Sequence, residues 1–233
     1  MTEKRLAKAL AAAGVASRRT CEKMIFDGRV RVNGQVIQLP QTPVDLLRDR
    51  VEVDGKLIAR EEPKVYYVLN KPPGYVCSQQ RRGNEKLVLD LIPEQSVRLF
   101  TLGRLDKETS GLIIATNDGA FAQEVMHPSS GLTKEYLAKT NLEISLEHLK
   151  LLREGTLVEG VSIRPTKVHK IRKGTVKIVV KEGKKHEVRL LLKAAGLTVQ
   201  SLSRIRIGGL QLGNLELGTC RRVTRDDLNQ LFS

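Results

Sequence analysis

The sequence predicts an α+β protein of two domains, and three observations favour this fold class. Short strands, hairpins and short helices alternate along the chain, with no repeat of about 20–50 residues. A length of 233 residues suffices for a small domain and a larger one. Residues 59–64 are charged and contain a proline, which is typical of a linker. We therefore predict domains at residues 1–60 and 61–233.

The first sixty residues predict two short helices followed by a small sheet. Apolar residues at helical spacing indicate a helix at 6–13 that ends at a glycine. Ser17 is a candidate cap for a second helix at 18–27. The alternating stretches 30–36 and 51–57 each contain an Asn-Gly or Asp-Gly pair, which favours hairpins.

The larger domain is predicted to be built on a mixed, largely antiparallel sheet, whose strand order the pattern does not give. The expected strands are 65–69, 99–102, 112–115, 134–138, 157–163, 175–181 and 199–207, with a hairpin at 210–223. The expected helices are 87–92, 120–126, 145–154, 186–195 and a last helix opened by a Thr-x-x-acid capping box at Thr224.

The charge of the chain points to a polyanionic partner. There are 40 Lys and Arg against 26 Asp and Glu, a net charge of +14. Residues 161–190 hold ten Lys or Arg and two acids, so the basic groups cluster. Nucleic acid is favoured over a membrane, because no basic amphipathic helix and no spanning apolar run occur. The N-terminus does not resemble a signal peptide, so we expect a cytoplasmic protein.

The sequence predicts no metal, no cofactor and no disulfide framework. Cys21, Cys77 and Cys220 are far apart and form no CxxC pair. The four histidines, 127, 148, 169 and 186, have no metal-ligand spacing.

The segment 103–119 is the candidate site. Gly-Arg-Leu-Asp at 103–106 precedes a polar turn and the apolar run 112–115, so buried structure anchors a charged loop. Such a loop can hold a reacting carboxylate, and Asp106 is that candidate. From spacing alone, an ordinary Asx turn between Asp106 and Thr109 is the favoured interpretation.

Resemblance to a known family changes that balance. GRLDKETSGL resembles the catalytic motif of pseudouridine synthases. NKPPG before it, and KEYL, EGKKHEVR and SLSRIRIGGLQLGNLELG after it, stand in that family's order. More closely, the chain resembles the small-ribosomal-subunit-type (RsuA) branch, which modifies uridines in ribosomal RNA. The segment RLAKALAAAGVASRRTCEKMIFDGRVRVNGQV is similar to the alpha-L RNA-binding module, named after small-subunit ribosomal protein four.

The resemblance implies roles for named residues. It implies that Asp106 is the nucleophile, that Arg189 pairs with it, and that Tyr136 stacks on the target uracil. Arg104 would enter the RNA helix and fill the space of the flipped base, or else contact a phosphate. Tyr136 and Arg189 have plain alternatives, a core tyrosine and a surface arginine. Near Arg189 the chain departs from the branch, with His186 in place of the common Arg.

The remaining basic candidates are assigned to RNA contacts, mainly with phosphates. They are Arg18, Arg19, Arg29, Arg31, Lys71, Lys184 and Lys185.

The resemblance implies an enzyme that converts one uridine of ribosomal RNA to pseudouridine by base flipping. We expect a monomer that acts without a cofactor on a structured helix or stem-loop, and large-subunit RNA is favoured. The alternative is a non-catalytic RNA-binding factor in ribosome assembly, which would not require Asp106, Tyr136 and Arg189 together. A methyltransferase is disfavoured, because no Gly-rich cofactor loop follows a first strand.

Overall fold

A computed structural model describes residues 3–58, 60–94, 96–158, 160–181 and 183–233. The chain divides into two compact units. The N-terminal unit comprises residues 1–65 together with the short segments 94–99 and 116–119. The C-terminal unit comprises residues 66–93, 100–115 and 120–233. The N-terminal unit therefore includes two segments that are distant in sequence, 94–99 and 116–119. The predicted division at residue 60 does not assign these segments to the first domain.

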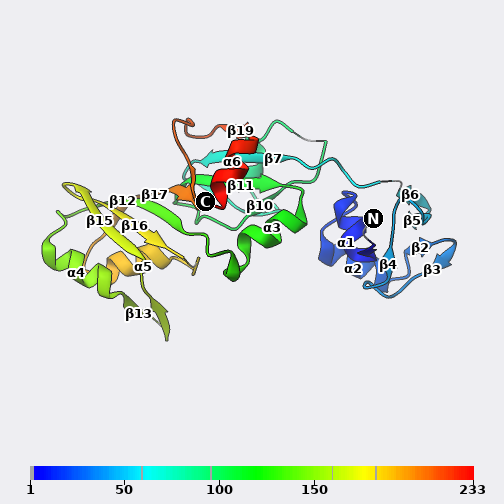
Figure 1. Cartoon of the computed structure of the whole chain (residues 1–233), viewed down its shortest axis with the longest axis horizontal. Helices are drawn as coiled ribbons and strands as arrows, with labels where there is room; N and C mark the ends of the chain where they lie inside the picture. The colour runs from blue at the N-terminus through cyan, green and yellow to red at the C-terminus, as the bar shows by residue number, and fades with distance from the viewer. Residues whose placement is uncertain (1–2, 59, 95, 159, 182) are drawn as a thin grey trace. The chain divides into compact units, whose positions relative to one another are not determined.

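The N-terminal unit contains two helices and small antiparallel sheets (Figure 1). The helices are α1 (Leu6–Ala12) and α2 (Arg18–Phe26), and the strands are β1 (Lys4–Arg5), β2 (Val30–Val32), β3 (Gln35–Val36), β4 (Pro43–Val44), β5 (Val51–Val53) and β6 (Lys56–Ile58). Four strands pair in the order β3–β2–β5–β6, and β1 pairs with β4. One core joins both helices to the strands through Leu10, Ile25 and Val51, all fully buried.

Local sequence signals explain these elements. The Ser17 side chain accepts a hydrogen bond from the Thr20 amide at 3.1 Å, so it caps α2 as predicted. The β2–β3 turn has positive φ at Asn33 and its glycine, and the β5–β6 turn has positive φ at Asp54 and its glycine. Two consecutive positive φ values define the type I′ turn that suits tight hairpins. Both predicted hairpins are confirmed.

The C-terminal unit is a mixed sheet with helices. Its strands are β7 (Tyr66–Lys71), β8 (Tyr75–Val76), β9 (Lys86–Leu87), β10 (Phe100–Leu102), β11 (Ser110–Thr116), β12 (Lys134–Thr140), β13 (Thr156–Val158), β14 (Val161–Ile163), β15 (Lys167–Arg172), β16 (Thr175–Val180), β17 (Val199–Ile207), β18 (Leu210–Gln211) and β19 (Cys220–Arg222). Its helices are α3 (Gly119–Met126), α4 (Leu146–Glu154), α5 (Glu187–Ala194) and α6 (Arg225–Leu231), with 3₁₀ turns η1 (Val88–Leu91) and η2 (Pro128–Ser130).

The main sheet has the order β15–β16–β12–β17–β11–β7–β19, with β10 beside β11 and β18 beside β17. The pairs β15–β16, β16–β12, β12–β17 and β7–β19 are antiparallel, whereas β11–β17 is parallel. The predicted α+β class with a mixed, mostly antiparallel sheet is therefore confirmed.

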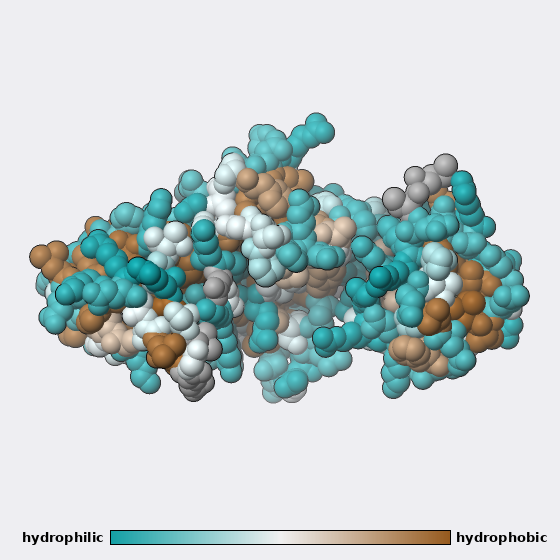
Figure 2. All heavy atoms as spheres, turned by 60° about the horizontal axis from the view of Figure 1, so that its bottom comes forward, coloured by the Kyte–Doolittle hydropathy of each residue, from teal (hydrophilic) through white to brown (hydrophobic). Residues whose placement is uncertain are grey.

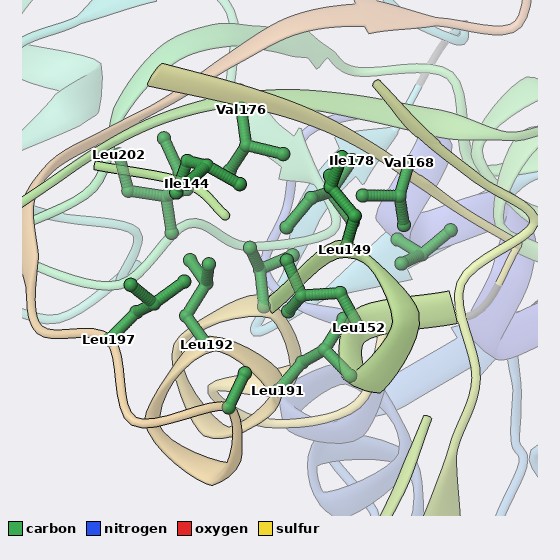
Figure 3. Close-up of a cluster of buried hydrophobic side chains, with 14 of the residues drawn as sticks. Ile144, Leu149, Leu152, Val168, Val176, Ile178, Leu191, Leu192, Leu197 and Leu202 are labelled. Carbon is green, nitrogen blue, oxygen red and sulfur yellow. The ribbon is translucent and has the colours of Figure 1, made fainter. Parts of the chain in front are cut away.

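Two separate hydrophobic cores support this sheet. Helices α4 and α5 lie on one side of β12, β15 and β16 (Figure 1), and their leucines pack against the valines and isoleucines of these strands (Figure 3). The second core joins α3 and α6 to β7, β10, β11 and the end of β17. Over the face shown in Figure 2, hydrophilic residues cover most of the surface, in keeping with the high content of charged residues.

A short parallel pairing links the two parts of the sheet. Strands β11 and β17 pair only at Ser110 with Ser203 and at Gly111 with Arg204. Gly111 has a φ of 107°, and a Cβ there would lie 2.2 Å from the Arg204 carbonyl oxygen. Only glycine therefore allows this close approach. The pairing does not continue beyond this point, so the sheet leaves space between its two cores.

Some element predictions were wrong. Residues 157–163 form a hairpin, β13–β14, with a positive-φ glycine at its turn, and not one strand. Residues 87–92 form a 3₁₀ turn, because the Asp90 carboxylate accepts the Leu87 amide and closes a single turn. Residues 210–223 do not pair with each other, since β18 pairs with β17 and β19 with β7. Strand β15 was not predicted.

The last helix provides a test of stability. The Asp227 carboxylate accepts the Thr224 amide at 2.7 Å and two hydrogen bonds from Arg221, and these interactions hold the pKa of Asp227 well below its ordinary range. We expect Asp227→Asn to lower the free energy of unfolding by about 2 kcal/mol near neutral pH. Urea unfolding followed by circular dichroism would measure it.

The pH dependence has a defined sign. Because the folded pKa of Asp227 is depressed, its contribution is fully present above the unfolded pKa of about 3.9 and is lost as the pH falls below it. The gap between wild type and Asp227→Asn should therefore be constant down to about pH 5 and shrink below about pH 4. A gap that widened in acid would contradict this account.

Candidate active site

Asp106 lies on the loop between β10 and β11, as the sequence predicts. The neighbouring Leu105 is buried, and its amide lies 3.4 Å from the Cys77 sulfur. The Thr109 amide donates to the main-chain carbonyl of Asp106 at 3.0 Å, which closes a turn without using the carboxylate. The Asx turn is therefore absent at this position of the described chain, and the carboxylate of Asp106 is left to face the cavity beside it.

The cavity has a volume of about 1180 Å³ and lies entirely within the C-terminal unit. Its apolar wall comes from both cores, for example from Leu102 and Ile207 of one and Val188 and Leu202 of the other. Among its described lining residues are eight Lys or Arg and three carboxylates. The volume suits a nucleotide-sized ligand, and the charge favours an anionic one.

Lys71, at the end of β7, corrects one of our predictions. We assigned it an RNA contact, but its side chain is fully buried, with 0% exposure. Its amino group donates to the carbonyls of Thr109 at 2.8 Å, Lys107 at 3.1 Å and Pro72 at 3.1 Å. Burial lowers the pKa of this amino group, and the nearby Cys77, Glu108 and Asp106 oppose that effect. Lys71 therefore holds the Asp106 loop from inside the protein.

Arg189 holds the same loop from α5. Its guanidinium donates to the Glu108 carbonyl at 3.0 Å and lies 3.4 Å from the Thr109 hydroxyl. Within the described residues it forms no ion pair with Asp106. The structure thus brings Arg189 to the predicted loop but bonds it to the backbone, and its direct pairing with the carboxylate stays a prediction.

His186 is the residue that contacts the Asp106 carboxylate, with Nε2 3.4 Å from Oδ1. It precedes α5 in the left-handed conformation, with φ of 56° and ψ of 20°. This conformation is uncommon for residues other than glycine, although histidine adopts it more often than most. Sequence reasoning noted His186 only as a departure from the branch pattern, and no spacing signal could have shown its contact with Asp106.

Tyr136 lies on β12, partly buried against the core beneath the sheet, and lines the cavity. The β12–β17 register shifts between Glu135 and Tyr136. Arg104 is exposed at the cavity edge, as are Lys185 and, with less exposure, Lys184, whose amino group donates to the Ser162 carbonyl at 2.5 Å. The predicted residues Arg104, Asp106, Tyr136, Lys184, Lys185 and Arg189 therefore all line one cavity.

The four arginines predicted in the N-terminal unit are all exposed. Arg18 pairs with Glu22 one helical turn away at 3.1 Å, and Arg31 donates to the Gly34 carbonyl. Arg29 donates twice to the Asp54 carboxylate, so its charge is partly neutralised. Arg29 is therefore a weaker candidate for a phosphate contact than Arg18, Arg19 and Arg31.

Four basic residues that line the cavity were missed by sequence reasoning, namely Arg82, Lys107, Lys134 and Arg204. Lys134 opens β12, and Arg204 is a strand residue of β17 that is only 3% exposed. An arginine in an alternating strand predicts exposure, and nothing in the local pattern indicates otherwise. No group of three or more His, Cys, Asp or Glu residues in the described chain has the geometry of a metal site.

The chain thus consists of a small unit of two helices and antiparallel strands and an α+β unit with a cationic cleft that contains a carboxylate. Comparisons with known proteins define the class further. Residues 65–194 match the family model described as RNA pseudouridylate synthase, and residues 4–51 match the S4 domain model. The chain therefore belongs to the RNA pseudouridine synthase family and carries an S4 domain.

Similar proteins agree with this membership. An uncharacterized RNA pseudouridine synthase of Aquifex aeolicus is 40% identical over 237 residues, covering 100% of this chain and 95% of the relative. Ribosomal large subunit pseudouridine synthase B of Bacillus subtilis is 36% identical, covering 97% and 95%. A chloroplastic protein of Arabidopsis thaliana, provisionally named a ribosomal large subunit pseudouridine synthase, is 47% identical, and the match covers 97% of this chain and 60% of that protein.

A solved structure shows the same fold. The crystal structure of a pseudouridylate synthase has a TM-score of 0.71 and 27% sequence identity, covering 98% of this chain and 99% of that one. No helix among the described residues is long and apolar enough to cross a membrane.

The internal position of Lys71 yields a prediction. We expect Lys71→Met to leave RNA affinity unchanged and to lower the rate of pseudouridine formation by up to about 100-fold, because the loop loses its fixed geometry. Filter binding and single-turnover assays would separate the two quantities. Lys139→Met, at an exposed lysine outside the cavity, is the matched control. A fall in affinity for Lys71→Met with an unchanged rate would restore the RNA-contact interpretation.

The His186 contact yields a second prediction. His186→Asn tolerates the left-handed backbone but has a side chain too short to keep the contact with Asp106. We expect its turnover to fall by about two- to fivefold, because an exposed charge contact of this kind contributes at most about 1 kcal/mol. His186→Arg, which keeps a donor, should recover most of the loss, and His169→Asn, exposed on β15, should have no effect. Equal losses in the Asn and Arg variants would show that the contact does not contribute.

Proposed function

We propose that this protein isomerises one uridine of large-subunit ribosomal RNA to pseudouridine, as a member of the RsuA-type branch of its family, with Asp106 as the nucleophile. One observation carries the proposal: the Asp106 carboxylate faces a cationic cavity on a loop held by Lys71 and Arg189. Family membership supplies the reaction, and relatives named for the large ribosomal subunit support that choice of RNA.

The reaction requires one pocket for two steps. The bond between the ribose and a ring nitrogen of uracil breaks, the base turns, and a ring carbon is joined to the ribose instead. That carbon loses its proton and the freed nitrogen gains one, so the product is an isomer of the substrate. Asp106 forms a covalent intermediate with one part of the substrate while the base turns. Attack on the ribose and attack on the base are both compatible with the geometry. The loop geometry keeps the carboxylate at one distance from the substrate throughout.

Two cavity residues would handle the base. Tyr136 offers a flat surface with its ring against a firm core, which suits stacking on the flipped uracil. Arg104 is exposed two residues before Asp106, where it can enter the vacated space in the RNA helix. Unstacking the base costs a few kcal/mol. A guanidinium both stacks on bases and carries a charge, so Arg104 would offset part of that cost.

The RNA would be held on both units. Lys184 and Lys185 lie at the cavity, and Arg18, Arg19 and Arg31 are exposed on the S4 domain. These contacts would give affinity and position on a structured helix or stem-loop, whereas the base in the cavity gives the reaction. We propose that the protein acts as a monomer in the cytoplasm, where a bacterial ribosome matures.

One experiment tests the proposal. Pseudouridines in ribosomal RNA would be mapped in cells that lack the protein and in the same cells supplied with wild type or Asp106→Asn. Asn keeps the shape of the side chain but cannot act as the nucleophile. We expect one large-subunit site to disappear and only wild type to restore it. Asp118→Asn, on a different loop, should restore it as wild type does.

Other outcomes would exclude parts of the proposal. Restoration by Asp106→Asn would remove Asp106 as the nucleophile. A site in small-subunit RNA would correct the substrate. If no site changed in any strain, a non-catalytic role in ribosome assembly would replace the enzymatic one.

A further inference from the structure

The cavity lining contains two basic side chains that form no ion pair among the described residues. Arg204 lies on β17, and Lys134 lies at the start of β12, and both line the cavity. Within the described residues, neither forms an ion pair with a carboxylate. Basic groups that are buried in proteins are almost always paired, because an unpaired charge away from water is costly.

The hydrogen bonds of Arg204 leave one donor unused. Its Nε donates to the Leu112 carbonyl at 2.8 Å, across the gap where β11 and β17 stop pairing. Its Nη2 is buried and has no partner among the described residues. An unsatisfied buried guanidinium N–H group calls for an acceptor, and Arg204 is one of the residues that line the cavity.

Lys134 adds a second donor beside the first. Its amino group has a single long hydrogen bond, to the Lys181 carbonyl at 3.3 Å, so it has further N–H groups to offer. Gly183 lies next to it, since a Cβ there would be 3.9 Å from the Lys134 nitrogen. Burial, and then the positive charge of Arg204, lowers the pKa of Lys134, and the carboxylate of Glu187 opposes this.

We propose that Lys134 and Arg204 form a phosphate subsite that binds a backbone phosphate of the uridine held in the cavity. This rests on the proposed function for the identity of the nucleotide. An oxyanion can accept from several N–H groups at once, so one phosphate can satisfy both side chains. A neutral carbonyl oxygen would leave the two positive charges uncompensated.

The position relative to Tyr136 fits one nucleotide. Lys134 and Tyr136 are two residues apart on the same strand and line the same cavity, which places them about 7 Å apart along β12. A base against Tyr136 and a phosphate at Lys134 are then joined through a single ribose. Phosphate binding here would fix the ribose between them, close to Asp106.

Binding of small ligands to the full chain tests the subsite. Calorimetry would compare uridine, uridine 5′-monophosphate and uridine 3′-monophosphate on wild type, Lys134→Met and Lys139→Met. Lys139 lies exposed on the same strand and outside the cavity, so it is the matched control for loss of charge. Arg204 is left unchanged, because its hydrogen bond to Leu112 holds the two strands together.

We expect wild type to bind one monophosphate about 10- to 100-fold more tightly than uridine, as for a hydrogen-bonded charge. Lys134→Met should lose this advantage while its affinity for uridine is unchanged, and Lys139→Met should keep it. Inorganic phosphate alone should bind wild type more weakly than that monophosphate and compete with it.

Several results would overturn the proposal. Equal affinity of wild type for all three ligands would exclude a phosphate subsite. Equal weakening of uridine and the monophosphates by Lys134→Met would assign the lysine to the base or ribose. Inorganic phosphate as tight as the monophosphate would exclude a nucleotide phosphate as the specific ligand. If the monophosphate binds more tightly than uridine but no pseudouridine is formed, only the proposed function is excluded. If pseudouridine is formed but the monophosphate binds no more tightly than uridine, only the phosphate subsite is excluded.

Discussion

The side chain of Lys71 is fully buried, so its amino group needs hydrogen-bond acceptors inside the protein. Three carbonyls meet that need, and two of them, from Lys107 and Thr109, belong to the Asp106 loop. Because the carbonyls of this loop turn inward, Asp106 is free to face the cavity. Breaking these bonds would leave a buried charge and its acceptor carbonyls without hydrogen-bond partners, which is costly. This cost favours a single conformation of the Asp106 loop. Arg189 adds a second attachment from α5.

The cleft beside this loop follows from a second constraint, the close approach of β11 and β17 at Gly111. Two paired residues suffice to join the halves of the sheet, and each half then builds its own core. The gap exposes charged groups from β12, β17 and the start of α5 to one shared space, with Arg204 bonded across the gap.

The fold class, both type I′ hairpins, the caps at Ser17 and Thr224 and the loop carrying Asp106 could be predicted from sequence, because each depends on residues close along the chain. The rest depends on contacts between distant segments. The burial of Lys71 is decided by a loop about 37 residues away, so a lysine beside a turn looked solvated. The His186 contact depends on a left-handed backbone, and the position of Arg204 on strand order, which periodicity does not encode.

The excess of basic groups in the cavity bears on more than the protein's own carboxylate. Eight Lys or Arg line the cavity together with Asp106. RNA brings phosphate groups into the same cavity. A phosphate near Asp106 that is not neutralised by basic groups would repel the carboxylate. A phosphate held by Lys134 and Arg204 is neutralised where it binds, so the nucleotide can enter without that opposition. The basic groups of the cleft then serve both partners, the carboxylate of the protein and the phosphate of the substrate.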